Sequence, residues 1–251
     1  MTYCVGILTR SGLVVAADSR SNAGVDHITT VRKLALFERA GERVMALLSA
    51  GNLATTQAVV TLLNQRLGSA PGPHDLYAAT TMFDAARMVG AVLREVLAHD
   101  GEHVQPHGDP SATFLFAGEL EGGRHRLFLI YPAGNFIEAT PETPFLQAGE
   151  TKYGKPILDR VISHDCSLAA AAKCALLSFD ATMRSNLSVA PPIDIWCYRA
   201  GSLSAAVRVD IQAGDPYLAV LREQFGAGML ELFQRLPDPA WAPPADAAAA
   251  E

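Results

Sequence analysis

Apolar and polar positions divide the chain into short apolar runs and longer segments with apolar residues every three or four positions. The runs at 2–9 and 13–19 are typical of β-strands, and Arg10-Ser11-Gly12 between them predicts a hairpin turn. Further strands are expected at 34–37, 44–49, 113–116, 127–131, 135–138, 194–198 and 204–211. Helical periodicity predicts helices at 53–67, 75–99, 156–162, 168–183 and 216–236.

The order of these elements predicts the fold class. Strands come first, then two helices, strands, two helices, strands and a last helix, which does not fit a parallel sheet built from βαβ units. It fits an α+β fold, a four-layer α/β/β/α sandwich in which two antiparallel sheets stack face to face with a helical layer outside each. With 251 residues, 49% of them hydrophobic, the chain is long enough for one large core. We expect one domain over 1–236 and a flexible Pro/Ala-rich tail over 237–251.

Composition narrows the function classes. The formal net charge is −6 and the longest basic run is Arg32-Lys33, which argues against a nucleic acid or an anionic membrane as partner. The four cysteines show no CxxC spacing, and neither a signal peptide nor an 18-residue apolar stretch is present, so we expect a reduced, cytoplasmic protein. Without a Walker loop, a Rossmann fingerprint or a Gly-x-Ser-x-Gly elbow, the sequence predicts no cofactor.

Two groups of polar residues suggest other chemistry only weakly. Histidines and aspartates gather at 99–109, but Pro106 interrupts the helical spacing that a His-x-x-x-His metal site needs, so we expect a solvated loop and no metal. Asp26-His27 resembles a hydrolase dyad, yet adjacent residues of a strand point to opposite faces, so a relay between them is not expected.

Thr2 is the most informative candidate, because it directly follows Met1 and opens the first predicted strand. A threonine hydroxyl is a poor nucleophile, but a threonine at the N-terminus carries its own base, an α-amine with a reference pKa of about 8. Thr2 is small enough for methionine aminopeptidase, so we expect removal of Met1 with no longer propeptide. The alternative is that Thr2 is an ordinary small second residue.

Three later residues fit the same chemistry. Asp18 ends the second predicted strand, where a carboxylate in an apolar run needs a cation, and Lys33 follows fifteen residues later. Lys33 held by Asp18 would place positive charge beside the Thr2 hydroxyl and amine. Gly51 precedes a helix, whose free N–H groups could stabilise an oxyanion. A structural ion pair and a plain helix-start glycine are the alternatives.

Together these residues resemble the catalytic frame of proteasome-type β-subunits, which are N-terminal nucleophile hydrolases. Within that superfamily, the runs at 2–6, 17–26 and 184–194 look like the bacterial branch called Anbu, the ancestral β-subunit. The resemblance covers nearly the whole chain. It implies a self-assembling threonine peptidase in which Thr2 is the nucleophile, Asp18 and Lys33 tune it, and Gly51 gives an oxyanion N–H.

The resemblance also has departures. Proteasome β-subunits orient the N-terminal amine with a Gly-Ser-Gly turn and a later Asp-x-x-Ser, and the corresponding stretches here are Gly149-Glu150-Thr151 and 180–185. Asp180 and Ser185 are therefore the expected amine-orienting residues, although their spacing is longer by two. Glu150 or Thr151 is the candidate replacement for the serine that is missing from the first stretch. If neither replaces it, the amine would be poorly oriented, and the site would cleave standard peptides slowly or not at all.

Three functions stay open from the sequence. The first is a threonine endopeptidase acting on peptides or proteins inside a homo-oligomer. The second is an amidase for small amides or isopeptide-like bonds, and the third is an inactive scaffold or peptide-binding shell. Segments 53–63 and 82–97 look apolar over more than one face, which fits either subunit contacts or a larger internal core. The resemblance favours assembly well above a dimer, as a closed ring or a helical array. Any unfoldase would be a separate protein.

Overall fold

The structure is a computed structural model that describes residues 2–22, 28–68 and 74–242. Met1, the Asp26-His27 pair and residues 243–251 of the expected tail lie outside the described residues. The chain packs as two compact units, 1–213 and 214–251, and each is described on its own. The expected division into a domain over 1–236 and a tail stays a prediction.

The first unit contains two five-stranded antiparallel sheets. The first sheet has the order β10-β1-β2-β11-β12 and is made of β10 (Phe145–Gly149), β1 (Tyr3–Thr9), β2 (Gly12–Asp18), β11 (Ile193–Arg199) and β12 (Arg208–Ile211). The second runs β5-β6-β7-β8-β9 and is made of β5 (Leu34–Arg39), β6 (Arg43–Gly51), β7 (Ala112–Leu120), β8 (Arg126–Ile130) and β9 (Phe136–Glu138). Two short strands, β3 (Arg20–Asn22) and β4 (Ile28–Thr30), pair with each other.

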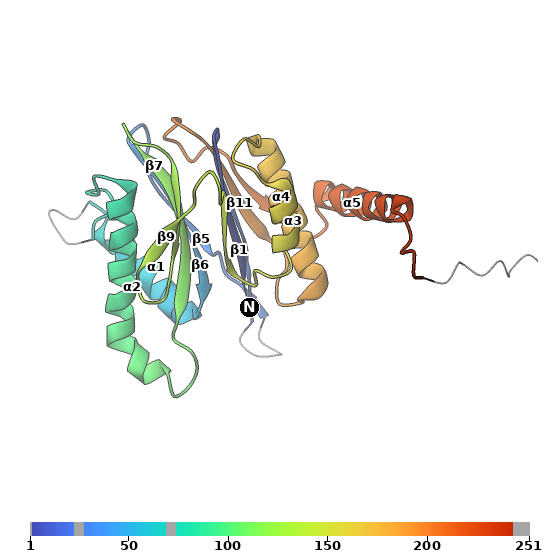
Figure 1. Cartoon of the computed structure of the whole chain (residues 1–251). Coiled ribbons are helices and arrows are strands. Elements are labelled where there is room, and N and C mark those ends of the chain that lie inside the picture. The colour runs from blue at the N-terminus through green and yellow to red at the C-terminus, as the bar shows by residue number, and fades with distance from the viewer. Residues whose placement is uncertain (1, 23–27, 69–73, 243–251) are drawn as a thin grey trace, which may run out of the picture. The chain divides into compact units, whose positions relative to one another are not determined.

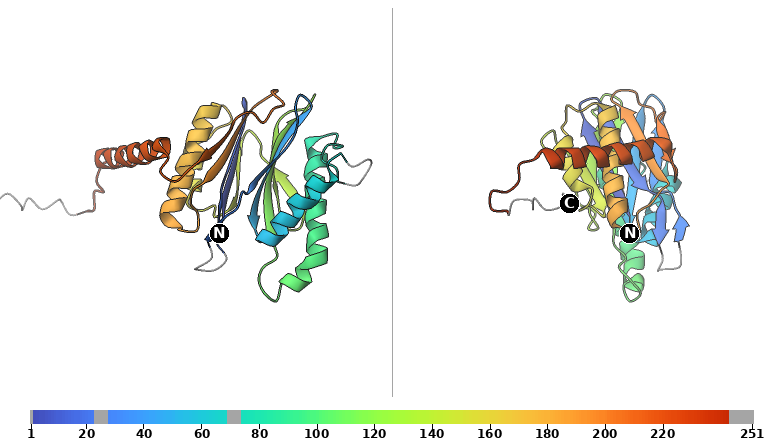
Figure 2. Two further views of the ribbon diagram at one scale, coloured as in Figure 1. Left: turned by 180° about the vertical axis from the view of Figure 1, so that it is seen from behind. Right: turned by 90° about the vertical axis from the view of Figure 1, so that its right-hand side faces the viewer.

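Helices cover the outer face of each sheet (Figure 1). Helices α1 (Leu53–Arg66) and α2 (Met82–Val104) pack on the second sheet, and α4 (Leu168–Ser185), with α3 (Lys155–Val161) beside it, packs on the first. Figure 2 shows the same layers from behind, with the two sheets between the helical layers. The predicted α/β/β/α sandwich is therefore confirmed.

Alternation along β6 shows why its sequence reads as a continuous apolar run. Val44, Ala46 and Leu48 point into the core between the sheets, whereas Met45 and Leu47 point into the core beneath α1 and α2. Because both faces of the strand are buried, no polar residue marks a solvent side. The middle layers thus form a core that fixes the strand ends at which the candidate site lies.

The helix predicted at 75–99 has different limits. It begins at Met82, because Asp75 caps a turn by accepting the Tyr77 N–H at 2.8 Å, while the Thr81 hydroxyl caps the helix by accepting the Asp84 N–H at 3.0 Å. It continues to Val104 and ends ahead of Pro106, so the start of the expected polar loop is helical. The strands β3, β4 and β10 were not predicted.

The second unit consists chiefly of α5 (Pro216–Arg235). Asp215 caps it by accepting the Leu218 N–H at 2.9 Å, and Pro216 occupies the first turn, where its missing N–H is not needed. Most of its apolar side chains are exposed. None of the helices that the structure describes is long and apolar enough to cross a membrane.

Candidate functional site

Asp18 and Lys33 form a buried ion pair at the end of β2. The Lys33 ammonium donates to both oxygens of Asp18 at 2.9 Å and to the Arg20 carbonyl at 2.5 Å. Asp18 also accepts the backbone N–H groups of Tyr3, at 2.9 Å, and Arg20, at 3.1 Å. The structure thus brings together the two charged residues that the sequence singled out, and Asp18 bonds to the residue that follows Thr2.

The electrostatics of this pair are those of a buried site. The side chains of Lys33 and Asp18 are 6% and 0% exposed. Burial raises the pKa of the Asp18 carboxyl, while Lys33 and the two N–H donors act in the opposite direction. A buried pair contributes little to stability compared with well-packed apolar residues, so its presence at a strand end beside the chain start fits a functional site.

The backbone at Thr2 is fixed on the side of β10. The Thr2 carbonyl accepts the Glu150 N–H at 2.8 Å, and Gly149 pairs with Tyr3. Gly149 has a φ of +80°, and a side chain at this position would collide with the Thr2 carbonyl. The start of the Gly149-Glu150-Thr151 stretch therefore lies directly against Thr2.

Helix α4 brings Asp180 to the same region. The ring of Tyr3 lies 4.6 Å from that of Phe179, and its hydroxyl donates to Ser178 at 3.0 Å, so this turn of α4 packs against the start of β1. Asp180 follows and is buried, with 5% of its surface exposed. Ser185 lies in the last turn of α4 with an exposed side chain.

Asn186 is a residue that the sequence argument missed. It caps the C-terminus of α4, and its side-chain amide donates to Glu150 at 2.9 Å. Glu150 itself is 9% exposed and has Lys152 at 3.6 Å. Asn186 directly follows Ser185 in the sequence, and this neighbourhood is the signal that could have identified it. Glu150 and Asn186 thus link the end of β10, at Thr2, to the end of α4.

Gly51 ends β6 at the predicted junction between strand and helix. Its φ is +111°, and a Cβ atom there would lie 2.5 Å from the Ser111 carbonyl oxygen. Backbone packing alone therefore requires glycine at this position. Asn52 caps α1 by accepting the Thr55 N–H at 3.2 Å. The oxyanion role of Gly51 stays a prediction.

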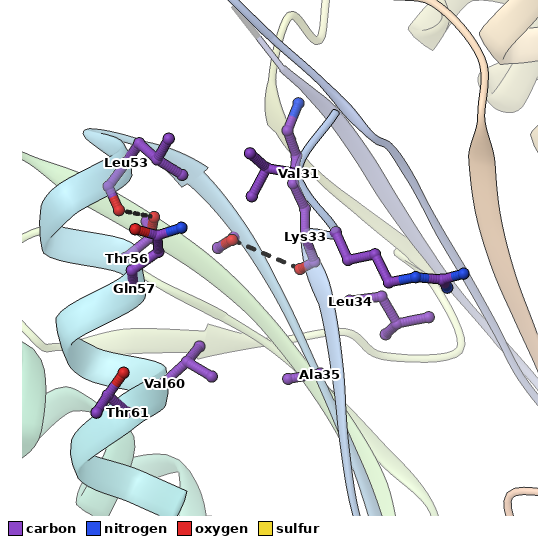
Figure 3. A pocket seen from close by; sticks show the side chains of 11 residues that line it. Val31, Lys33, Leu34, Ala35, Leu53, Thr56, Gln57, Val60 and Thr61 are labelled. Carbon is purple, nitrogen blue, oxygen red and sulfur yellow. Dashed lines mark hydrogen bonds between the residues drawn. The ribbon is translucent and has the colours of Figure 1, made fainter. Parts of the chain in front are cut away.

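A pocket of about 300 Å³ opens beside Lys33, between α1 and the chain entering β5 (Figure 3). Lys33, a member of the ion pair, lines it together with Ser49 of β6, and Thr56 and Val60 line it from α1. The Ser49 N–H donates to the Lys33 carbonyl at 3.1 Å, which ties the floor of the pocket to the ion pair. The full lining consists of Val31, Arg32, Lys33, Leu34, Ala35, Ser49, Leu53, Thr56, Gln57, Val60 and Thr61.

In the segments that the structure describes, no group of three or more His, Cys, Asp or Glu residues is placed to hold a metal ion. Within the polar stretch at 99–109, His99 contacts Asp100 at 2.7 Å on an exposed turn of α2.

Comparison with solved structures identifies the family. Anbu (ancestral β-subunit) from Yersinia bercovieri is 45% identical, with a TM-score of 0.89, over 96% of this chain and 100% of that one. Anbu from Hyphomicrobium sp. strain MC1 is 46% identical, with a TM-score of 0.86, over 94% and 99% of the two chains. The chain belongs to the Anbu family. A structure described as the helical assembly of the Anbu complex from Pseudomonas aeruginosa is 46% identical, with a TM-score of 0.90, over 95% and 98% of the two chains. No family model and no curated protein matches.

Membership in the Anbu family confirms the resemblance seen in the sequence and makes the chain a proteasome-like β-subunit. The similarity extends over both compact units, because each relative covers almost the whole chain. The family assignment does not by itself give a substrate or a reaction, which the geometry of the site must supply.

Proposed function

We propose that this Anbu subunit is a threonine hydrolase that cleaves peptide bonds with Thr2 after Met1 has been removed. The observation that carries the proposal is the buried Asp18–Lys33 pair, whose carboxylate bonds to the N–H of Tyr3, the residue next to Thr2. In the proposed site, Lys33 is the positive charge that acts on Thr2, a residue that can carry both a hydroxyl and a free amine.

The reaction requires only groups of this chain, the substrate and water. The free amine of Thr2 takes the hydroxyl proton as the oxygen attacks the carbonyl carbon of the scissile amide. The positive charge of Lys33 favours the developing alkoxide and keeps the amine unprotonated. The Gly51 N–H donates to the oxyanion. The C–N bond then breaks, the leaving nitrogen takes the proton from the amine, and water hydrolyses the ester left on Thr2.

Orientation of the amine is assigned to residues at the ends of β10 and α4. Asp180 and Ser185 keep the roles that the resemblance gives them, and Glu150 takes the place of the missing serine. Glu150 supports this assignment because its N–H holds the Thr2 carbonyl and its carboxylate is fixed by Asn186. A fixed carboxylate is an acceptor for an ammonium or amine N–H group.

The pocket beside Lys33 accepts the substrate side chain on the acyl side of the scissile bond. Its volume of about 300 Å³ and its apolar and hydroxyl-bearing wall suit a medium-sized uncharged side chain. The Lys33 ammonium already donates to both Asp18 oxygens and to the Arg20 carbonyl, so it has no N–H group left to bind an acidic side chain in the pocket.

Labelling with a peptide epoxyketone tests the proposal, since this probe reacts with an N-terminal threonine through its hydroxyl and its amine. Intact mass should show loss of Met1 and addition of one probe per chain, and Thr2→Ala should remove the addition. Retention of Met1 in most of the protein would overturn the mechanism, because the amine would then be an amide. Residual labelling of Thr2→Ala would indicate another nucleophile such as Cys4.

Labelling combined with cleavage assays on peptides and on small amides separates the remaining alternatives. A labelled enzyme that cleaves small amides but no peptides would be an amidase, and an unlabelled protein without Met1 would be a scaffold. We also propose self-association, supported by the helical assembly described for the relative from Pseudomonas aeruginosa. A cytoplasmic location and an unfoldase partner stay predictions.

A further inference from the structure

A second buried carboxylate, Asp194, lies on the strand that neighbours the strand of Asp18. Asp194 on β11 is fully buried and pairs with Ala17, the residue before Asp18. It accepts Arg32 Nη1 at 3.0 Å and both Arg208 Nε, at 2.8 Å, and Arg208 Nη2. A buried carboxylate is costly unless it is paired, and here two guanidinium groups pair with it.

This network holds the chain on both sides of Lys33. Arg32, the residue before Lys33, uses its other terminal nitrogen to bond Asp210 at 3.1 Å. Arg208 donates to the carbonyl of Leu34, the residue after Lys33, at 3.4 Å. The anchoring residues belong to β11 and β12 of the first sheet, whereas Leu34 begins β5 of the second. The network therefore joins the two sheets at the segment of backbone that carries the Lys33 side chain.

Lys33 depends on such anchoring because it lies outside regular structure. Val31, Arg32 and Lys33 connect β4 to β5, and backbone bonds hold this connection through the Val31 N–H to Ser19, at 2.7 Å, and the Lys33 carbonyl to Ser49, at 3.1 Å. The Lys33 ammonium is held by Asp18 at the end of a four-carbon side chain of limited length, so a shift of the backbone at Lys33 would strain the bonds to Asp18. In an active site, a displacement of about 1 Å can lower the rate by about a hundredfold.

We propose that Asp194 and Arg208 are positioning residues, which fix Lys33 against Asp18 through Arg32 and the Leu34 carbonyl. The inference rests on the proposed function, since Lys33 acts on the Thr2 hydroxyl and amine only there. Arg32 also lines the pocket, so changing it would alter substrate binding as well. The test therefore uses Arg208, whose side chain is 31% exposed and whose replacement leaves no large cavity in the core.

Arg126 provides a matched control. Its guanidinium makes a two-nitrogen ion pair with Glu138, its side chain is 20% exposed, and it pairs with Gly118. On β7, Gly118 is six residues from Ala112, the residue paired with Gly51, which corresponds to about 20 Å along a strand. Arg126→Ala thus breaks a similar ion pair at the other end of the sandwich.

The experiment compares Arg208→Ala, Arg208→Lys and Arg126→Ala as assembled proteins from which Met1 has been removed. The inactivation rate constant and the binding constant of the peptide epoxyketone are measured against pH, and thermal unfolding is measured in parallel. We expect both Arg208 variants to lower the inactivation rate constant at least about tenfold, with probe binding changed less than about twofold. Because the positive charge of Lys33 is displaced from the Thr2 amine, the pKa of the amine should rise, and the midpoint of the pH profile should move to higher pH.

Arg126→Ala should lower thermal stability without either change. An Arg208→Ala rate and pH profile equal to those of Arg126→Ala would overturn the inference while leaving the proposed function intact. Should the unaltered protein take no label, the proposed function fails, and hydrogen exchange at residues 31–35 decides the structural part of the inference. Faster exchange there in Arg208→Ala than in Arg126→Ala would support anchoring of the Lys33 segment, and equal exchange would overturn it.

Discussion

Two carboxylates, Asp18 and Asp194, lie buried on adjacent strands at the site end of the first sheet. Asp18 is paired with Lys33, whereas Asp194 shares Arg32 and Arg208 with Asp210, so each group has as many negative as positive charges. Arg32 and Lys33, which bond to Asp194 and Asp18, are neighbours in the chain, so the proposed positioning role connects the two carboxylates through this segment. Because both carboxylates are buried, water screens their charges little, and replacing a single charged residue changes the electrostatics of the site.

The first prediction concerns the ion pair. Lys33→Met and Asp18→Asn should each abolish epoxyketone labelling, because the first removes the charge that favours the alkoxide and the second removes the anchor of that charge. Breaking a buried pair costs about 3–5 kcal/mol, so light scattering must show that the variants still assemble. Lys155→Met, which removes an exposed pair with Asp159, is the control and should label normally. Labelling of Lys33→Met at the normal rate would exclude a catalytic role for Lys33.

A second prediction concerns alkaline pH. Tyr198 is fully buried, and its hydroxyl donates to Glu119 at 2.8 Å. Burial, together with Glu119, raises the pKa of Tyr198 from its ordinary value of 10 to about 12. The unfolded chain therefore loses this proton at lower pH than the folded chain, so the stabilising contribution is complete below pH 10 and is lost as the pH rises towards about 12.

Urea unfolding at pH values across this range measures the effect. The free energy of unfolding should fall between pH 10 and about 12, and it should fall less in Tyr198→Phe. Burial also raises the pKa of Tyr3, so the variant should keep part of the decrease. An identical decrease in Tyr198→Phe would show that its phenol ionises alike in both states.

The sequence identified Asp18 and Lys33 because a carboxylate inside an apolar strand needs a cation. The same reasoning applied to Asp194 would have flagged it, but its partners could not be named. Arg32 and Arg208 stand 162 and 14 residues away and reach it from different elements. Such pairing depends on strand order and register, which no local spacing encodes.

At the scale of elements, the candidate site is built from the ends of strands β2, β6 and β10, where Asp18, Gly51 and Gly149 lie. The strands with buried faces on both sides were predicted, since their apolar runs are continuous. Strand β10 was missed because Phe145–Gly149 is an edge strand with mostly half-buried residues, and β3 and β4 have three residues each. The start of α2 was misplaced because Asp75 is as good a capping residue as Thr81, and only the turn geometry decides between them.

The end of β10 gives the third prediction. Gly149 and Gly41 have φ values of +80° and +81°, but only at Gly149 would a side chain meet other atoms, those of Thr2. Gly41→Ala should therefore cost only the backbone strain of about 1–2 kcal/mol. Gly149→Ala should cost more, because the Thr2 backbone must move as well, and it should also slow epoxyketone labelling. Urea unfolding and labelling of both variants check this, and equal behaviour of the two would show that Gly149 does not shape the site.

At the scale of the whole molecule, apolar surface indicates where subunits meet. The apolar residues of α1 and α2 lie mostly in the core beneath these helices, which accounts for the two segments that looked apolar over more than one face. Exposed large apolar side chains are instead frequent on α5, where the described ones are Tyr217, Val220, Met229, Leu230, Leu232 and Phe233. A helix with so much exposed apolar surface is typical of a protein contact.

The last prediction is that the exposed apolar face of α5 is a contact between subunits. Met229 and Phe233 are 57% and 72% exposed and lie four residues apart, hence on one face of α5. We expect light scattering to give a mass well above that of a dimer for the unaltered protein, and a lower mass for Phe233→Lys, because a lysine in an apolar contact is costly to bury. Glu231→Gln is the control: it changes the charge by the same amount on the opposite face of the helix, and it should assemble normally.

The possible outcomes lead to different conclusions about assembly. A stable monomer near 26.7 kDa for the unaltered protein, with full labelling by the epoxyketone, would exclude both assembly and any need for an enclosed site. An unchanged mass for Phe233→Lys would instead show that subunits meet through surfaces other than this face of α5. If the mass falls but labelling per chain is unchanged, each subunit contains a complete site, and assembly serves to control which substrates reach Thr2.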